Sequence, residues 1–196
     1  VWGTVLLKFL MKIVGIARIN ELYAHSCDKK GTAFTASILR EFQVTYTVDH
    51  RSILEQLPSG GFITISNHPY GALDGIILID LIASIRPDYR VMVNKILENV
   101  VSMSDHFIGV VPPSGNTPID RRSMSGLKAA MRHIREGHPL GFFPSGAVAR
   151  YDWRLRVREQ SWQSSVIRLI QQIKAPVVPI YFHGHNSALY NSIGLI

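Results

Sequence analysis

Short apolar runs alternate with amphipathic segments along most of the chain. Five runs rich in β-branched and aromatic residues are typical of strands, at residues 61–66, 89–94, 106–111, 140–144 and 176–182. Helical spacing of apolar residues marks the segments 73–85, 123–136 and 161–173. This alternation predicts an α/β fold with a central, mostly parallel sheet flanked by helices. In such sheets, functional groups collect beyond the carboxyl ends of the strands.

The first 24 residues have a different pattern. Apolar residues such as Trp2, Phe9 and Ile13 recur at helical spacing, while Lys8 and Lys12 lie on the opposite side. An amphipathic helix of this kind either lies in a membrane interface or packs on its own domain. No run reaches the roughly 18 uninterrupted apolar residues expected of a membrane-spanning helix.

We expect a single domain over residues 1–196, of which residues 1–24 form an N-terminal amphipathic helix at the membrane interface. The last residues, NSIGLI, contain no stop signal, so a continuation at the C-terminus stays open.

The charge of the chain narrows the class of partner. Lys and Arg number 21 against 14 Asp and Glu, a formal charge of +7, while 46% of the residues are hydrophobic. A basic globular protein favours an anionic membrane surface or a phosphorylated substrate. Nucleic acid is not expected, because no aromatic-basic RNA-binding motif is present. The single cysteine, Cys27, excludes an internal disulfide framework and a cysteine-based zinc site.

The stretch FITISNHPYGALDG, residues 62–75, carries the strongest candidate chemistry. His68 follows the end of a predicted strand, and Asp74 falls in the first turn of the next predicted helix. A carboxylate can fix the tautomer of a histidine, leaving the other ring nitrogen to take a proton from a substrate hydroxyl. Equally, Asp74 could only cap its helix beside an incidental histidine.

Four blocks in order carry a family resemblance. NHPYGALDG (67–75) resembles the first motif of the glycerolipid acyltransferase superfamily, the lysophosphatidic acid acyltransferase-like enzymes, where a histidine and an aspartate form the catalytic pair. The blocks at 109–123, 141–150 and 175–187 look like the second, third and fourth motifs. The form Asn-His-Pro-x-Gly-x-x-Asp-Gly resembles a bacterial subgroup that includes relatives acylating lyso-aminolipids.

The sequence departs from the family pattern in two places. Five residues rather than four separate His68 from Asp74, and Gly71 can absorb the extra residue in the turn. Ser145 stands where most members carry glutamate, so the identity of the acceptor does not carry over.

The resemblance implies catalytic roles for His68 and Asp74. It also implies that several residues bind the substrate, namely Arg121, Arg122, Ser145, Gly146 and Arg150. Backbone N–H groups near Gly71 or Gly146 are candidates for the oxyanion site. No cofactor and no metal is expected, since an acyl-carrier-protein or coenzyme A thioester serves as co-substrate.

The expected function is transfer of a fatty acyl group from an acyl thioester to the hydroxyl of a lysolipid, lysophosphatidic acid-like or a lyso-aminolipid, in membrane lipid synthesis. We expect a peripheral protein on the cytoplasmic face of the inner membrane. A thioesterase or lipid hydrolase is the alternative enzyme, and an inactive membrane-binding module is the non-enzymatic alternative.

Other basic residues have less specific interpretations. Arg154, Arg156 and Arg158 form either a basic rim or a solvated strand face. His106, His133 and His138 are expected at the surface or at strand edges.

Overall fold

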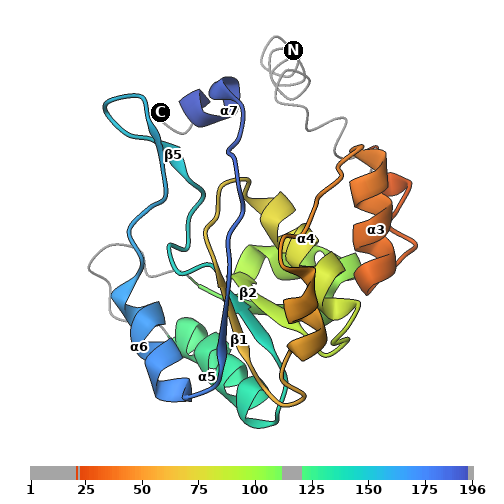
Figure 1. The fold of residues 1–196 in the computed structure, drawn as a ribbon, viewed down its shortest axis with the longest axis vertical. Helices are drawn as coiled ribbons and strands as arrows, with labels where there is room; N and C mark the ends of the chain where they lie inside the picture. The colour runs from red at the N-terminus through yellow and green to blue at the C-terminus, as the bar shows by residue number, and fades with distance from the viewer. Residues whose placement is uncertain (1–20, 22, 112–120, 194–196) are drawn as a thin grey trace.

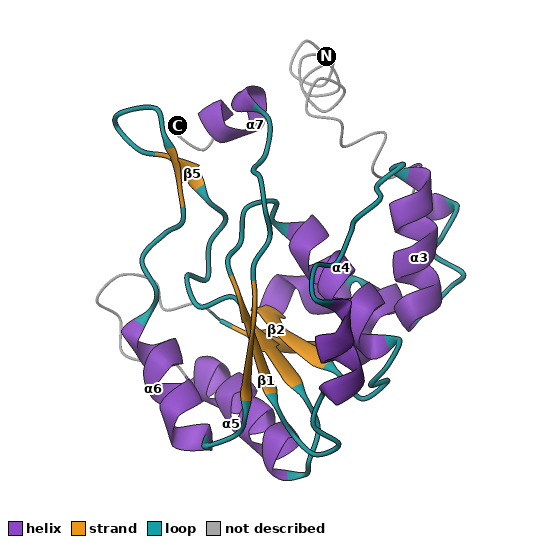
Figure 2. Ribbon diagram, in the orientation of Figure 1, coloured by secondary structure: helices purple, strands orange, loops and turns teal. Residues whose placement is uncertain are grey.

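The computed structural model describes residue 21 and residues 23–111 and 121–193, apart from the side chains of 121–123, 189, 192 and 193. Its centre is a five-stranded sheet in the order β3-β2-β4-β1-β7, with every neighbouring pair parallel. The strands are β1 (Ile63–Ser66), β2 (Arg90–Asn94), β3 (Phe107–Val110), β4 (Leu140–Phe142) and β7 (Val177–Ile180). Because all strands run the same way, their carboxyl ends meet at one edge of the sheet (Figure 2).

Strand β1 lies between β4 and β7, and Ile63 is level with Leu140 on one side and Val177 on the other. Phe62, Ile63 and Leu140 are fully buried, as expected of a parallel sheet covered on both faces. The residues that follow β1, β4 and β7 therefore share one end of the molecule, although they come from distant parts of the chain.

Helices cover both faces of the sheet (Figures 1 and 2). On one face, α3 (Gly31–Glu41) and α4 (Ala72–Ala83) pack together around Phe34, Leu78 and Ile82. On the other face, α5 (Arg121–Arg135) and α6 (Ser164–Ile173) bury Ala130, Ile134 and Leu169 against the sheet. Each core thus combines an apolar helix stripe with the alternating residues of the strands.

Shorter elements connect this framework. They are the 3-10 helices η1 (Arg51–Gln56), η2 (Lys95–Asn99) and η3 (Val101–His106), the antiparallel strands β5 (Arg150–Tyr151) and β6 (Val157–Arg158), and α7 (Ala188–Ile193). The β5–β6 hairpin and α7 lie at the same end of the molecule, and α7 packs on β5 (Figure 1).

The predicted α/β fold is confirmed, with all five predicted strands and all three predicted helices between residues 61 and 182 present. The sequence did not predict α3, the β5–β6 hairpin or α7. The predicted interface helix over residues 1–24 lies almost wholly outside the described residues. None of the helices in the described ranges has the length and hydrophobicity required to cross a bilayer.

Of the histidines expected at the surface or at strand edges, His106 directly precedes the edge strand β3, but neither it nor His133 is at the surface. His106 is buried, and its Nδ1–H donates to the carbonyl oxygen of Tyr89 at 2.7 Å. His133 is also buried, with Nε2 3.2 Å from the carbonyl oxygen of Pro139. A neutral imidazole can be buried when a backbone carbonyl accepts its N–H, a partner that helical or strand spacing does not reveal.

Candidate active site

The turn between β1 and α4 places the two predicted catalytic side chains. β1 ends at Ser66, and α4 begins at Ala72 after Gly71, whose backbone lies at φ +78° and ψ −127°. Only glycine adopts this region without strain, so Gly71 allows the chain to reverse within five residues. Asp74 then falls at the third helical position, facing back toward the turn.

His68 and Asp74 are in direct contact. Nδ1 of His68 lies 2.9 Å from Oδ2 of Asp74. A carboxylate only accepts, so Nδ1 carries the proton and the lone pair of the neutral ring is on Nε2. No described residue donates a hydrogen bond to Nε2, and 17% of the His68 side chain is exposed. The ring can therefore accept a proton from a molecule in solution, as general base catalysis requires.

Asp74 is fully buried and organises the turn. Its Oδ2 also accepts the backbone N–H groups of Tyr70, at 2.9 Å, and Gly71, at 3.0 Å. The other oxygen, Oδ1, is buried and accepts no hydrogen bond from the residues that the structure describes. Through one oxygen, Asp74 therefore joins the His68 ring to the two backbone amides of the turn.

Three other residues hold His68 in place. Phe143, just after β4, stacks on the imidazole with ring centroids 4.1 Å apart. The backbone N–H of Ala149 donates to the carbonyl oxygen of His68 at 2.8 Å, and the backbone N–H of His68 donates to the Glu159 carboxylate at 3.0 Å. The ring plane and both backbone polar groups of His68 are thus fixed by residues more than 70 positions away in the chain.

The sequence pattern did not indicate roles for Phe143 or Glu159. Phe143 lies within the third motif block, and this is the signal that could have indicated a position beside the first motif. Glu159 is the only acidic residue after Asp152 in the basic segment 150–160, which is a weak signal.

Asn67 connects the candidate site to the end of β7. Its side-chain amide accepts the backbone N–H of Phe182 at 2.7 Å and donates to the carbonyl oxygen of Phe182 at 2.8 Å. Asn186 adds a second connection by donating to the carbonyl oxygen of Pro69 at 3.0 Å. These bonds give the turn that carries His68 the rigidity of the sheet edge.

The other predicted site residues differ in their positions. Ser145 is buried, and its hydroxyl donates to the carbonyl oxygen of Ala147 within the same loop. Gly146 is exposed in that loop, and Arg150 is exposed at the start of β5, one residue after the contact with His68. Arg121 and Arg122 begin α5, but their side chains lie outside the described part of the chain.

Among the backbone N–H groups near Gly71 and Gly146 that are candidates for the oxyanion site, those of the two glycines themselves are already engaged. The N–H of Gly71 already donates to Asp74, and the N–H of Gly146 donates to the carbonyl oxygen of Phe143 at 2.9 Å. Each amide has one hydrogen, so neither group is available to a developing negative charge.

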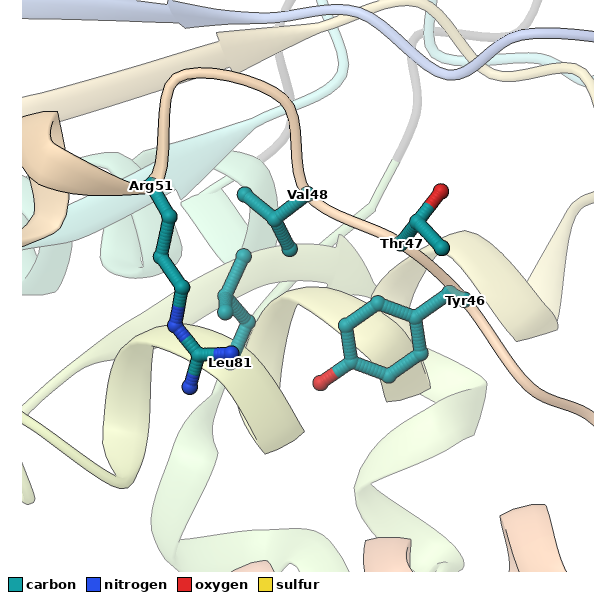
Figure 3. A pocket seen from close by; sticks show the side chains of 5 residues that line it. All are labelled: Tyr46, Thr47, Val48, Arg51 and Leu81. Carbon is teal, nitrogen blue, oxygen red and sulfur yellow. The ribbon is translucent and has the colours of Figure 1, made fainter.

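A concave pocket lies elsewhere, between α4 and the segment before η1 (Figure 3). Its lining residues are Tyr46, Thr47, Val48, Arg51 and Leu81. The pocket shares no residue with the surroundings of His68, so we assign it no part in the chemistry. In the described part of the chain, no three His, Cys, Asp or Glu side chains come together as ligands for a metal ion.

Comparison with known proteins adds independent information. A family described as "Acyltransferase" matches residues 3–195. A lyso-glycine lipid O-acyltransferase of Bacteroides thetaiotaomicron is 26% identical over 189 residues, covering 95% of this chain and 65% of its own length. A protein of the same name from Phocaeicola vulgatus is 24% identical over 191 residues, covering 96% of this chain and 65% of its own length. The chain therefore spans about two thirds, but not all, of these curated relatives.

Proposed function

The chain belongs to the acyltransferase family, and from this premise we propose that it transfers a fatty acyl group from an acyl thioester to the hydroxyl of a lysolipid. The single observation that carries the proposal is the 2.9 Å contact between His68 and the buried carboxylate of Asp74 at the carboxyl end of β1. That pair supplies a positioned base whose other nitrogen has no partner among the described residues.

The proposed mechanism uses His68 twice. Nε2 takes the proton of the acceptor hydroxyl as its oxygen attacks the thioester carbonyl carbon, forming a tetrahedral intermediate. The C–S bond then breaks, and the imidazolium returns the proton to the departing thiolate. Asp74 stabilises the imidazolium and keeps the proton of the resting ring on Nδ1. No covalent acyl-enzyme is required, since the acceptor oxygen itself is the nucleophile.

For the acceptor we propose a lyso-glycine lipid or a closely related lyso-aminolipid. Two relatives of about 25% identity are named lyso-glycine lipid O-acyltransferases, which supports this class. A glycine headgroup ends in a carboxylate, and Arg121, Arg122 and Arg150 are the residues we propose to hold it by charge-assisted hydrogen bonds. Ser145 and Gly146 complete the proposed binding loop.

The donor is an acyl-carrier-protein or coenzyme A thioester. The protein works at the cytoplasmic face of the inner membrane in membrane lipid synthesis, with residues 1–24 as its interface helix within one domain.

The test is a comparison of wild type with His68→Ala in a host that accumulates lyso-glycine lipid, followed by labelled thioester assays on purified protein. We expect wild type to convert the lyso-lipid and His68→Ala to lose about 100-fold to 10,000-fold in rate. Near-normal transfer by His68→Ala would remove the histidine from the mechanism.

The same assay separates the alternative enzyme class. Release of labelled free fatty acid at the same rate with and without lysolipid would indicate a thioesterase instead of an acyltransferase. Vesicle binding with no turnover of any acceptor would indicate an inactive membrane-binding module.

A further inference from the structure

The β5–β6 hairpin, residues 150–158, carries an unusual combination of exposed side chains. At its tip, 82% of Trp153 and 69% of Leu155 are exposed. The hairpin also contains four arginines, at positions 150, 154, 156 and 158, against one aspartate. Exposed aromatic and aliphatic residues among arginines are typical of segments that bind at the boundary between lipid headgroups and acyl chains.

The tip is held in one conformation by Asp152. Its Oδ1 accepts the backbone N–H groups of Arg154, at 2.8 Å, and Arg156, at 3.0 Å, while Oδ2 pairs with the Arg156 and Arg158 guanidinium groups. The backbone N–H of Arg156, foremost among these donors, holds the pKa of Asp152 below its ordinary value. The exposed side chains are therefore presented by a preorganised turn, which lowers the entropic cost of binding.

The unusual backbone conformation of Leu155 is not explained by burial of its side chain. Its backbone lies at φ +55°, a strained conformation for a non-glycine residue, yet the side chain projects into solvent. Arg154 lies over the Trp153 ring at 4.3 Å, so a cationic group and an aromatic face are presented together.

The base of the hairpin is bonded to the candidate active site on both strands. Immediately before the hairpin, the N–H of Ala149 donates to the carbonyl oxygen of His68. Immediately after it, the Glu159 carboxylate accepts the backbone N–H of His68. A surface that holds the tip of this hairpin would therefore be at a fixed distance from the imidazole.

Other exposed aromatic residues share this end of the molecule. Tyr181 follows the carboxyl end of β7, and Tyr190 lies on α7, which packs against β5 (Figure 1). Tyrosine and tryptophan are the residues enriched at membrane–water interfaces.

We infer that the hairpin 150–158 is a membrane-docking finger that inserts Trp153 and Leu155 into an anionic lipid surface and sets the candidate active site at headgroup level. The inference deepens the proposed function, because a lysolipid would then reach His68 from the bilayer. An acidic carrier protein would use the arginines but would leave Trp153 and Leu155 in water, so the exposed apolar tip favours lipid.

Tryptophan fluorescence tests the finger itself. In the full chain with Trp2→Phe and Trp162→Phe, Trp153 is the remaining tryptophan. We expect its emission to shift to the blue on addition of phosphatidylglycerol-containing vesicles and to be quenched by brominated acyl chains. Protein that binds these vesicles with Trp153 emission unchanged would overturn the inference.

Binding measurements provide the matched controls. In a vesicle co-sedimentation assay, Trp153→Ala/Leu155→Ala should lower the partition coefficient about tenfold. Arg154→Ala should lower it about fivefold on anionic vesicles and hardly at all on phosphatidylcholine vesicles. The control Ile53→Ala/Arg135→Ala removes one exposed aliphatic side chain and one exposed arginine before the amino ends of β1 and β4, and it should bind as wild type does.

The outcomes also separate the finger from its alternatives. Two results together would overturn the inference in favour of a carrier-protein site. These are weaker binding of Arg154→Ala to acyl carrier protein and unchanged vesicle binding by Trp153→Ala/Leu155→Ala. If Trp153→Ala/Leu155→Ala loses turnover on lysolipid in vesicles but retains turnover on a monomeric short-chain lysolipid, the inference is supported. If wild type transfers nothing while Trp153 still inserts, the proposed function fails and the finger stands.

Discussion

At the scale of single residues, the candidate site depends on one carboxylate oxygen with three donors. Oδ2 of Asp74 accepts from the His68 ring and from two backbone amides of the turn. The orientation of the His68 ring and the backbone of the turn therefore depend on the same carboxylate. An informative substitution removes the negative charge of Asp74 but keeps the hydrogen bonds to the turn.

Asp74→Asn makes that separation. The amide oxygen can still accept the backbone N–H groups, but the negative charge that stabilises the imidazolium is gone. We expect kcat to fall about 100-fold to 10,000-fold while the circular dichroism spectrum stays that of wild type. A variant with nearly full kcat would show that the carboxylate only shapes the turn.

Glu159 is predicted to be a positioning residue. Glu159→Ala leaves the backbone N–H of His68 without its acceptor, and we expect a loss of about 10-fold to 100-fold in kcat with little change in acceptor KM. Glu159→Gln keeps an oxygen that can accept this N–H and should restore most of kcat. Equal losses in both variants would instead point to a role for the charge.

At the scale of elements, the junction of β1 and α4 determines whether His68 and Asp74 meet. The added Cβ of Gly71→Ala would lie 3.2 Å from Val148, and the backbone would remain at φ +78°. We expect a loss of roughly 1–3 kcal/mol in the free energy of unfolding, measured by urea denaturation.

Gly75→Ala is the matched control for this prediction. Gly75 lies four residues further along, inside α4, and its added Cβ would meet nothing within 4 Å. Since alanine is the better helix former, we expect a gain of roughly 0.5–1 kcal/mol. Destabilisation of similar size in both variants would mean that the special backbone of Gly71 is not the cause.

The elements also show what a sequence pattern can and cannot reveal. Periodicity predicted β1 and α4 because their apolar residues follow the strand and helix repeats. It did not predict α3, whose segment GTAFTASILRE buries Thr35 and Ser37 besides its apolar residues. Thr35 is satisfied there by Asp80 at 3.0 Å, a partner 45 positions away.

At the scale of the whole molecule, stability should depend on pH through a buried histidine. Burial lowers the pKa of His133, and the nearby Arg90 and His138 act in the same direction. The folded state therefore binds this proton less readily than the unfolded chain does. Its stabilising contribution is complete above the ordinary histidine pKa of about 6.5 and is lost as the pH falls.

We accordingly expect the melting temperature to fall between about pH 7.5 and about pH 5.5, with a smaller fall in His133→Gln. Glutamine can still donate to the Pro139 carbonyl but does not titrate. The exposed His25→Gln serves as the control and should keep the wild-type slope. An unchanged slope in His133→Gln would exclude His133 as the group responsible.

The sequence predicted the composition of the sheet and the motif that pairs His68 with Asp74. The order β3-β2-β4-β1-β7 could not be predicted, because β1 pairs with strands that begin 77 and 114 residues after it. The stacking of Phe143 on the His68 ring and the hydrogen bond from the His68 backbone to Glu159 depend on that order. Likewise, the engaged amides of Gly71 and Gly146 depend on hydrogen bonds that no spacing rule reveals.

The deep burial of α4 has a consequence for how relatives of this protein could diversify. Leu78, Ile79 and Ile82 are wholly inside the core, and the same helix carries Asp74 in its first turn. Repacking that helix would displace the carboxylate along with it. Inherited changes in lipid preference should therefore accumulate in those parts of the segments after β4 and β7 that make no contact with the turn carrying His68 and Asp74.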